Sequence, residues 1–598
     1  MQGSSDEQPE NLTDTESLGV AERRLILTAA LIQGLALYAL KFFAAVDTWS
    51  PVWQYLCFTV AIAIPPLVIV TIAPRLARGY WGIVAGFALL LALLAGYRGY
   101  QCSPAELVYC GEPVEFVPAI VIATFIVAFL LRACAGGAAR LQKPQYPALF
   151  HYSWDNALTI GLTLVFTGLF WLILFLWQAL FKLVGVDFFH DLFERDWFFY
   201  PVTWLVGGCG AILFRSQQSF VLTLKRLLRT MLVALLPLLA LLTIVFLATL
   251  PFTGLQPIWN TGHGSALLLW LVAVLLFFTN GVIQDEFPFA RYPKWINRLL
   301  LLALVVAPFY AAFAIYGLWL RVAQYGWTPE RLWGFVVAVT LALLAASYSL
   351  SILRRGQHWA EWLRRINTWL ALWVLAVCLV TQTPLVNFWR ISADSQLARL
   401  HSGRVQLADF DFFFLRHKLG RPGWQALETA KEMPAVRQQD QLTTYLEALQ
   451  GKTEEIWKLR ENPLHQSAEV RKLLDIQVLP QGRSLPEAFA PANSYKAPDE
   501  KWQRIWLARD LDGDGGDEFL LFSHSGEPLK HRNNRYLLTI TAYGLVNGAW
   551  QVVASDNREI DEDFPSLRQR LAGGELENRP SRWQSLYIGG ELLFDPTQ

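Results

Sequence analysis

Long apolar runs recur along the first two thirds of the chain, separated by short polar or charged stretches. A helix that crosses the hydrocarbon layer of a membrane needs about 20 mostly apolar residues. Eleven runs are long enough, and most have no charge near their centres. They cover residues 25–45, 53–73, 81–97, 114–134, 157–184, 197–214, 231–251, 264–284, 298–320, 332–353 and 368–386. The pattern predicts an α-helical polytopic membrane bundle of about 11 transmembrane helices.

The pattern changes on both sides of this region. Residues 1–22 are polar and acidic and lack the basic start of a signal peptide, which predicts a disordered cytoplasmic tail before a transmembrane domain over 23–386. Residues 387–475 are charged, with apolar residues at helical spacing, as in a helical juxtamembrane region. Residues 476–598 begin with a linker rich in Pro, Gly and Ser and continue with short β-type runs. Two of these runs are joined by Asn547-Gly548, a hairpin signal, so we expect the chain to end in a small β-rich part of an α+β domain.

Composition agrees with a membrane location. The 598 residues are 54% hydrophobic and only 17% charged, and the mean hydropathy is +0.32. Soluble domains carry about 25% charged residues, so an ordinary cytosolic enzyme and a disordered chain are both excluded. The net charge of +1 gives no basic field for nucleic-acid binding. The expected partners are the lipid bilayer and, as a second class, components of the cell envelope.

The positive charges fix the expected orientation, because short cytoplasmic loops carry an excess of Lys and Arg. Eighteen Lys and Arg residues lie on the side of the N-terminus and four to six on the other side. The N-terminus should therefore be cytoplasmic. Eleven spans then place everything after residue 386 outside, which in the inner membrane of a bacterium is the periplasm.

Six cysteines are present. Cys102 and Cys110 share one loop on the outer side, where an oxidising compartment favours a disulfide over two free thiols. The other four, Cys57, Cys134, Cys209 and Cys378, fall in or near spans, and we expect them to be buried packing residues.

One acidic segment in the β-rich part has the spacing of calcium ligands. Its oxygen donors would come from Asp510, Asp512, Asp514, Gly516 and Glu518. An EF-hand needs a glutamate at its twelfth position, where this chain has leucine, so the segment is closer to the short calcium loops between strands. Ca²⁺ would be structural here, and the alternative is an acidic turn without metal. No other cofactor is implied.

The outer loop from Asp187 to Asp196 clusters carboxylates among aromatic residues beside the membrane. Transferases that act on lipid-linked sugars use such acids as a base or as metal ligands. An amphipathic segment at the membrane surface has the same composition and is favoured, because no second catalytic motif is present. Transporters, in turn, often have broken helices, for which Pro65-Pro66, Pro237 and Pro308 are candidates.

Two stretches carry a family resemblance. The first is Gly-Trp-Thr-Pro-Glu-Arg at 326–331, in which Thr328 and Pro329 are typical of a helix start. The second runs from 387 to 423 and includes Arg-Ile-Ser at 390–392 and Ser-Gln-Leu-Ala-Arg-Leu at 395–400. Together they resemble the bacterial membrane family catalogued as domain of unknown function 4153, over about residues 20–430. The resemblance implies an inner-membrane protein and brings no activity or catalytic residue with it.

Three arginines in the second stretch lie on the predicted outer side, against the charge rule: Arg390, Arg399 and Arg404. They could bind a phosphate-bearing ligand such as a lipid headgroup. The alternative is internal ion pairing with nearby aspartates, Asp394 among them, which would dock the domain on the membrane.

Three functions follow from these features. The first is a non-enzymatic inner-membrane protein whose periplasmic domain serves envelope maintenance, assembly or sensing. The second is a transporter or flippase of a lipidic or amphipathic substrate. The third is a membrane glycosyl- or phospho-transferase that uses the 187–196 loop. The chain contains no P-loop, dinucleotide fingerprint, HExxH or GxSxG motif, which favours the first.

Overall fold

The structure is a computed structural model that describes residues 18–594 with internal gaps. The gaps are 45–48, 75–78, 103–114, 136–145, 284–291, 356–358, 451–459, 461, 465–475, 487–501, 512, 514, 529–534, 547–548, 576–585 and 589–590. The chain divides into two compact units. The membrane unit comprises Met1–Arg404, Phe412–Met433 and Glu447–Glu454, and the C-terminal unit comprises Val405–Asp411, Pro434–Leu446 and Glu455–Gln598.

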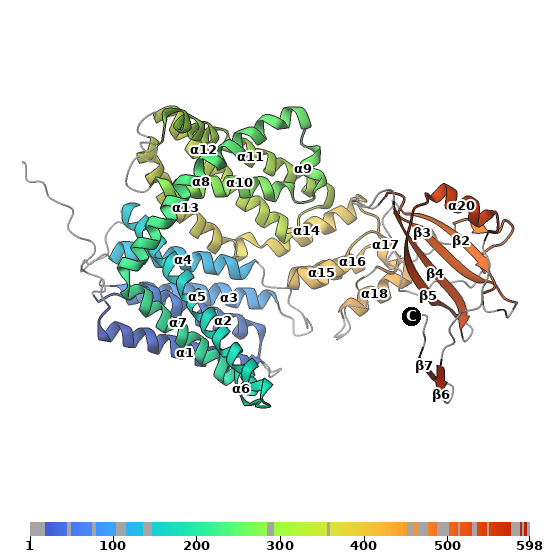
Figure 1. Ribbon diagram of the computed structural model, residues 1–598, viewed down its shortest axis with the longest axis horizontal. Helices are drawn as coiled ribbons and strands as arrows, with labels where there is room; N and C mark the ends of the chain where they lie inside the picture. The colour runs from blue at the N-terminus through green and yellow to red at the C-terminus, as the bar shows by residue number, and fades with distance from the viewer. Residues whose placement is uncertain are drawn as a thin grey trace, which may run out of the picture. The chain divides into compact units, whose positions relative to one another are not determined.

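All eleven predicted spans are confirmed as helices long and apolar enough to cross a membrane (Figure 1). They are α1 (Val20–Ala44), α2 (Pro51–Thr71), α3 (Tyr80–Gln101), α4 (Phe116–Ala135), α5 (Tyr146–Leu183), α7 (Asp196–Ser216), α8 (Gln218–Thr253), α10 (Gly264–Val282), α11 (Lys294–Tyr325), α12 (Pro329–Arg355) and α13 (Trp359–Val380). Two short helices, α6 (Phe188–Glu194) and α9 (Gln256–Asn260), lie in the connections before α7 and α10.

Local capping sets several helix ends. The predicted start of α12 is confirmed, because the Thr328 hydroxyl accepts a hydrogen bond from the Arg331 N–H at 3.4 Å and Pro329 is the first helical residue. The last span was predicted too far along the chain. It ends at Val380, and the Thr383 hydroxyl instead caps a short 3₁₀ helix, η3 (Pro384–Val386), by accepting from the Leu385 N–H.

The candidate prolines do not break their helices, since α2, α8 and α11 run through them without interruption. In α8, Pro237 has no N–H to donate to the Val233 carbonyl one turn earlier. The Tyr292 hydroxyl donates to this carbonyl at 2.5 Å, so the polar group that the proline leaves exposed is satisfied within the bundle.

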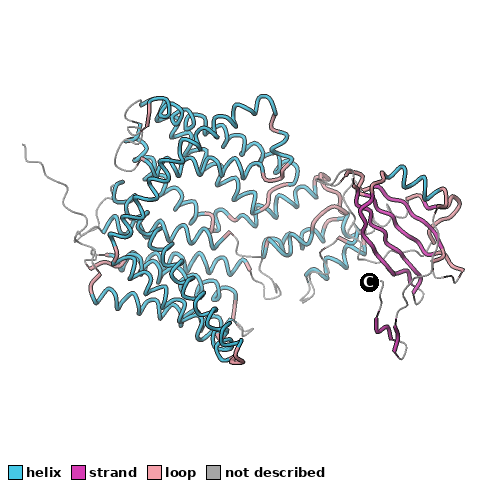
Figure 2. Tube along the Cα trace, viewed as in Figure 1, coloured by secondary structure: helices cyan, strands magenta, loops and turns pink. Residues whose placement is uncertain are grey.

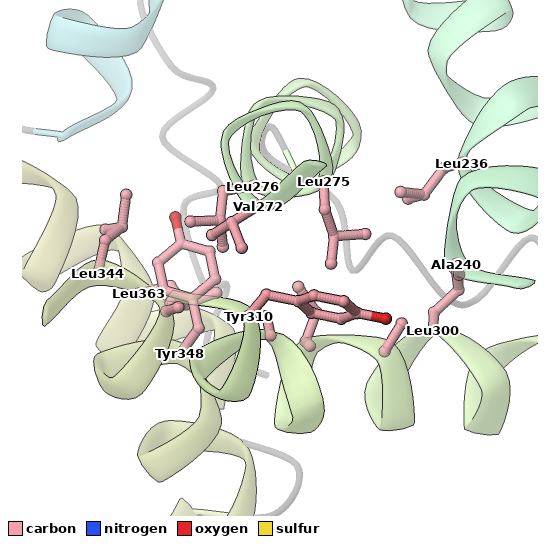
Figure 3. Packing of buried hydrophobic residues seen from close by; sticks show 14 of the residues in the cluster. Leu236, Ala240, Val272, Leu275, Leu276, Leu300, Tyr310, Leu344, Tyr348 and Leu363 are labelled. Carbon is pink, nitrogen blue, oxygen red and sulfur yellow. The ribbon is translucent and has the colours of Figure 1, made fainter. Parts of the chain in front are cut away.

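The largest core lies where α8, α10, α11, α12 and α13 meet (Figure 3). Small residues on α11, Ala303, Ala307 and Ala314, are fully buried, and they let neighbouring helices approach closely. Tyr310 and Tyr348 fill the space beside leucines of α10, and both are fully buried. This half of the membrane unit is therefore packed with side chains.

Shorter helices follow the last span. The membrane unit includes α14 (Phe388–His401), α15 (Phe412–Lys418) and α16 (Gly420–Glu432). Next come α17 (Pro434–Arg437) and α18 (Asp440–Gln450), which confirm helices in this charged region. Arg416 of α15 is buried, and its Nε donates to the Leu449 carbonyl at 2.9 Å.

Four of the predicted β runs form β2 to β5 of a five-stranded sheet in the order β1-β2-β3-β4-β5, whose first strand lies in the segment predicted as a linker (Figure 2). The strands are β1 (Val478–Leu479), β2 (Gln503–Arg509), β3 (Glu518–His524), β4 (Tyr536–Val546) and β5 (Ala549–Ile560), and all neighbours except β1 and β2 are antiparallel. Val546 pairs with Ala549, which confirms the hairpin expected around 547–548. One face of the sheet packs on α20 (Phe564–Ala572), and a separate hairpin joins β6 (Leu586–Ile588) to β7 (Glu591–Phe594).

Candidate functional site

The two stretches that carry the family resemblance contact each other. The Trp327 N–H, in the turn between α11 and α12, donates to the Ser395 hydroxyl of α14 at 3.1 Å. The Gln396 amide of α14 donates to the carbonyls of Tyr325 and Trp327, each at 3.0 Å. The turn therefore holds α14 against the end of the membrane helices, although the two stretches lie about 70 positions apart.

Two arginines complete this junction. Arg399 donates to the Gln324 carbonyl at 2.6 Å and Arg331 to the Gly326 carbonyl at 2.7 Å, so both guanidinium groups lie at the negative C-terminal end of α11. Gly326 has a φ of +74°, and a Cβ there would lie 2.8 Å from the Arg399 side chain. Only glycine fits this position.

The three predicted arginines have different surroundings. Arg399 holds the α11–α12 turn, and its pKa is lowered by burial and then by the charge of Arg404. The side chain of Arg404 is exposed. Arg390 lies 3.8 Å from Asp394, but both side chains are more than two thirds exposed, so the pair contributes about 1 kcal/mol or less.

Arg390 and Asp394 line a polar cavity of about 470 Å³, which we call the α14 pocket. The C-terminal end of α3, the short helix η3, α14 and α16 form its walls. The lining residues are Tyr97, Tyr100, Gln101, Pro384, Asn387, Arg390, Asp394, Leu397, Arg421, Pro422, Gln425, Ala426 and Thr429.

Arg421 is the second cation of the α14 pocket, and the sequence analysis did not single it out. Its Nη1 donates to the Tyr100 hydroxyl at 2.7 Å, and its guanidinium lies 3.9 Å from the centre of the Tyr100 ring. Asn387 donates to the Tyr97 hydroxyl at 2.9 Å and also caps α14. These contacts fix α14 and α16 to the end of α3.

A small cavity of about 20 Å³, roughly the size of one water molecule, adjoins the α14 pocket and shares Tyr97, Gln101 and Asn387 with it. The Arg98 guanidinium stacks 3.6 Å from the centre of the Trp389 ring in its wall. Glu115 also lines this cavity, and burial raises its pKa from 4.5 to about 7 although the charge of Arg98 opposes the change.

An apolar groove of about 280 Å³ lies between α2 and α4. Its lining residues are Gln54, Tyr55, Phe58, Thr59, Ile62, Phe116, Val117, Ile120 and Val121. Tyr55 is hydrogen-bonded to Arg98, and Phe116 directly follows Glu115, so the groove adjoins the small cavity.

In the 187–196 loop, Asp187 directly precedes α6 and Asp191 lies on it; both are exposed and line none of the three cavities. Asp196 pairs with Lys41 of α1 at 2.6 Å. Phe189 and Phe193 pack among aromatic residues of α5 and α7. These contacts are typical of an amphipathic segment at a membrane surface.

The predicted calcium loop is described only in part, because Asp512 and Asp514 lie outside the described residues. Both carboxylate oxygens of Asp510 accept backbone N–H groups, from Gly513 at 2.7 Å and Gly515 at 3.1 Å. Glu518 accepts from the Leu511 N–H at 2.7 Å. Within the described part of the chain no group of three metal-ligating side chains occurs, so calcium binding stays a prediction.

The cysteine predictions have mixed outcomes. Cys102 is buried at the end of α3, whereas Cys110 lies outside the described residues, so the disulfide stays a prediction. Cys378 is buried as expected, and Cys57 and Cys134 are half-buried. The prediction for Cys209 is wrong, because this thiol lies on an exposed face of α7 and an apolar face of a membrane helix can contact lipid instead of protein.

One half-buried ion cluster was missed by the sequence analysis. Asp155 of α5 pairs with Lys225 of α8, and Arg132 of α4 lies 3.8 Å from the same carboxylate. Arg132 also donates to the Asn156 side chain at 2.7 Å. The cluster ties three helices together, and the only signal in the sequence was the aspartate close to a predicted span.

Comparison with known proteins identifies a family. The family model described as "Domain of unknown function (DUF4153)" matches residues 30–430, which is more than half of the chain. No curated protein and no solved structure matches.

Proposed function

The chain belongs to the family described as Domain of unknown function (DUF4153), and we propose that it is a non-enzymatic inner-membrane protein that binds an anionic envelope ligand in the α14 pocket. Its role would be envelope maintenance, assembly or sensing. That it is an integral membrane protein follows from its eleven apolar helices and its family.

The observation that carries the proposal is the pair of guanidinium groups, Arg390 and Arg421, on the wall of one polar cavity. Among the lining residues that the structure describes, Asp394 is the only carboxylate, so their formal charge is positive. Arginine forks suit phosphate and carboxylate groups, to which they can donate two parallel hydrogen bonds. The exposed Arg390–Asp394 contact is weak enough for a ligand to replace it.

The location of this pocket is part of the proposal. The excess of Lys and Arg on the N-terminal side supports a cytoplasmic tail over 1–22 and an outer, periplasmic position for everything after residue 386. The α14 pocket would then face the periplasm, as would the helical region of 387–475 and the β-rich part of 476–598.

Other observations favour this function over the alternatives. The helices with candidate prolines are continuous, and one large core fills the bundle between α8 and α13, which gives a flippase no support. In the 187–196 loop, Asp196 serves an ion pair with α1, and the aromatic residues pack on membrane helices. A transferase would need the acids of that loop beside a substrate cavity.

The proposal can be tested in a deletion strain profiled for envelope stress and lipid composition. Arg390→Glu suits the test, because its exposed side chain can be replaced without disturbing the fold. We expect wild type and Arg404→Glu, a control with another exposed arginine, to restore the profile, and Arg390→Glu to fail at an equal protein level. Full restoration by Arg390→Glu would refute the proposal.

A further inference from the structure

We propose that the outer edge of β5 binds β5 of a second copy of this chain, in an antiparallel arrangement centred on Asn557, so that the two C-terminal sheets become continuous. This inference concerns the C-terminal unit and goes beyond the proposed function, because it does not depend on the α14 pocket.

The uncovered edge of β5 is the first argument. Among the described strands β5 pairs with β4 alone, and with 12 residues it is the longest of them. A strand with one covered face alternates between buried and exposed residues, whereas nine consecutive residues of β5, 551–559, are exposed. An edge of this kind presents backbone N–H and C=O groups that pair readily with another strand.

A bulge limits the part of the edge that can pair. Natural edge strands are often protected by proline, lysine or a bulge, and β5 contains neither proline nor lysine. Its pairing with β4 skips Val553, which therefore forms a bulge, and continues in unbroken register over 554–560. Asn557 is the midpoint of this regular segment.

The sequence of the segment is complementary to itself, which is the second argument. A twofold axis at Asn557 places each residue opposite the one that lies equally far on the other side of the axis. The opposite pairs are then Asp556 with Arg558, Ser555 with Glu559 and Ala554 with Ile560. Each pair is favourable, because it joins opposite charges, a hydroxyl donor with a carboxylate, or two apolar side chains.

The same charges exclude the neighbouring registers. If the axis moved by one residue in either direction, Asp556 or Arg558 would lie opposite itself, and like charges that face each other across two strands are destabilising. The midpoint of the regular segment and the charge pattern therefore select the same axis.

Contacts within one chain prepare the side chains for this pairing. The Arg558 Nε donates to Asp556 at 2.7 Å, and both side chains are more than half exposed. The Arg558 Nη groups can donate to Asp556 of the second copy, so that the two pairs form a ring of alternating charges. Asn557 accepts from the Thr539 hydroxyl at 2.6 Å, and its amide can donate to the second copy.

The membrane favours a second copy as the occupant. A single pair of short strands is small compared with an interface that is stable in solution, which buries about 1,200–2,000 Å². A chain with eleven apolar helices is confined to a membrane, where copies meet at a higher effective concentration. The pairing should therefore be tested in membranes.

The test is oxidative cross-linking of the full chain in membranes. Opposite residues of an antiparallel pair have Cα atoms about 4.5–5.5 Å apart, which is within the range of a disulfide. Asn557→Cys should therefore cross-link to its own copy. Ser555→Cys is the matched control, because it is exposed on the same strand but would lie about 13 Å along the strand from its own copy.

We expect the dimer band of Asn557→Cys to be roughly tenfold stronger than that of Ser555→Cys or wild type, because only a residue on the axis meets its own copy. Asp556→Arg, added to Asn557→Cys, should weaken the band, because it places two arginines opposite each other. Adding Arg558→Asp as well restores opposite charges and should restore the band. Tm values like that of wild type would show that the variants fold.

Two outcomes would overturn the inference. Equal bands from Asn557→Cys and Ser555→Cys would show random collision. No band from a folded Asn557→Cys variant would mean that solvent or a strand of another protein covers this edge. A band that persists unchanged with Asp556→Arg would overturn the axis that the charges select.

Discussion

Glu115 should make the stability of this protein depend on pH near neutrality. Its carboxyl group lies just before α4, in the wall of the small cavity, and burial raises its pKa from 4.5 to about 7. Arg98 and Lys418 lower this pKa and Glu330 raises it, but burial is the largest cause. The folded protein therefore holds a proton that the unfolded chain releases between pH 4.5 and 7.

The direction of the pH dependence follows from this difference in pKa. A carboxyl group that binds its proton more tightly in the folded state stabilises that state at low pH, and the contribution is lost as pH rises through the folded pKa. A rise in pKa from 4.5 to about 7 corresponds to a loss on the order of 3 kcal/mol, complete above about pH 7. Replacement by glutamine keeps the size of the side chain and removes the charge.

The assay is thermal unfolding of wild type and Glu115→Gln in the same detergent at pH 5 and pH 8. The variant should be the more stable of the two at pH 8, and the difference should shrink or vanish at pH 5. Because other groups titrate equally in both proteins, only the difference between them is compared. The same pH dependence in both proteins would refute the reasoning, because it would mean that Glu115 is as well solvated in the folded state as in the unfolded chain.

Three further predictions test the fold. Gly326→Ala should destabilise the protein by about 1–2 kcal/mol or more, seen as a lower Tm, because the residue has a φ of +74°; an unchanged Tm would contradict that turn. Tyr292→Phe should cost about 1 kcal/mol through the lost hydrogen bond to the carbonyl that Pro237 leaves unpaired, and less in a Pro237→Ala background; equal costs in both backgrounds would argue against this pairing. Alkaline phosphatase fused after Gln598 should be active in a bacterial host, and activity only of a cytosolic fluorescent fusion would reverse the orientation.

The sequence by itself determined the elements that depend on neighbours along the chain. An apolar run of about 20 residues can satisfy its backbone in a membrane only as a helix, so all eleven spans could be located from the sequence. Thr328 and Pro329 start α12 through a cap within one turn, and Asn547-Gly548 joins two β runs that are adjacent in sequence. The end of α13 was misplaced, although the polar Thr381, Gln382 and Thr383 and then Pro384 interrupt the apolar run directly after Val380.

The tertiary structure alone decided which of these elements meet. The α14 pocket joins Tyr97 to Asn387 and Tyr100 to Arg421, pairs that lie 290 and 321 positions apart. No periodicity or local motif links such residues, and the same holds for the half-buried pair of Asp155 and Lys225. The sequence does not distinguish one arginine from another. In the structure their surroundings differ, because helices from elsewhere in the chain bury one guanidinium group, place a carbonyl opposite another or stack an aromatic ring on a third. Packing between distant helices therefore determines the chemistry of the site, and the apolar pattern determines the helices that pack.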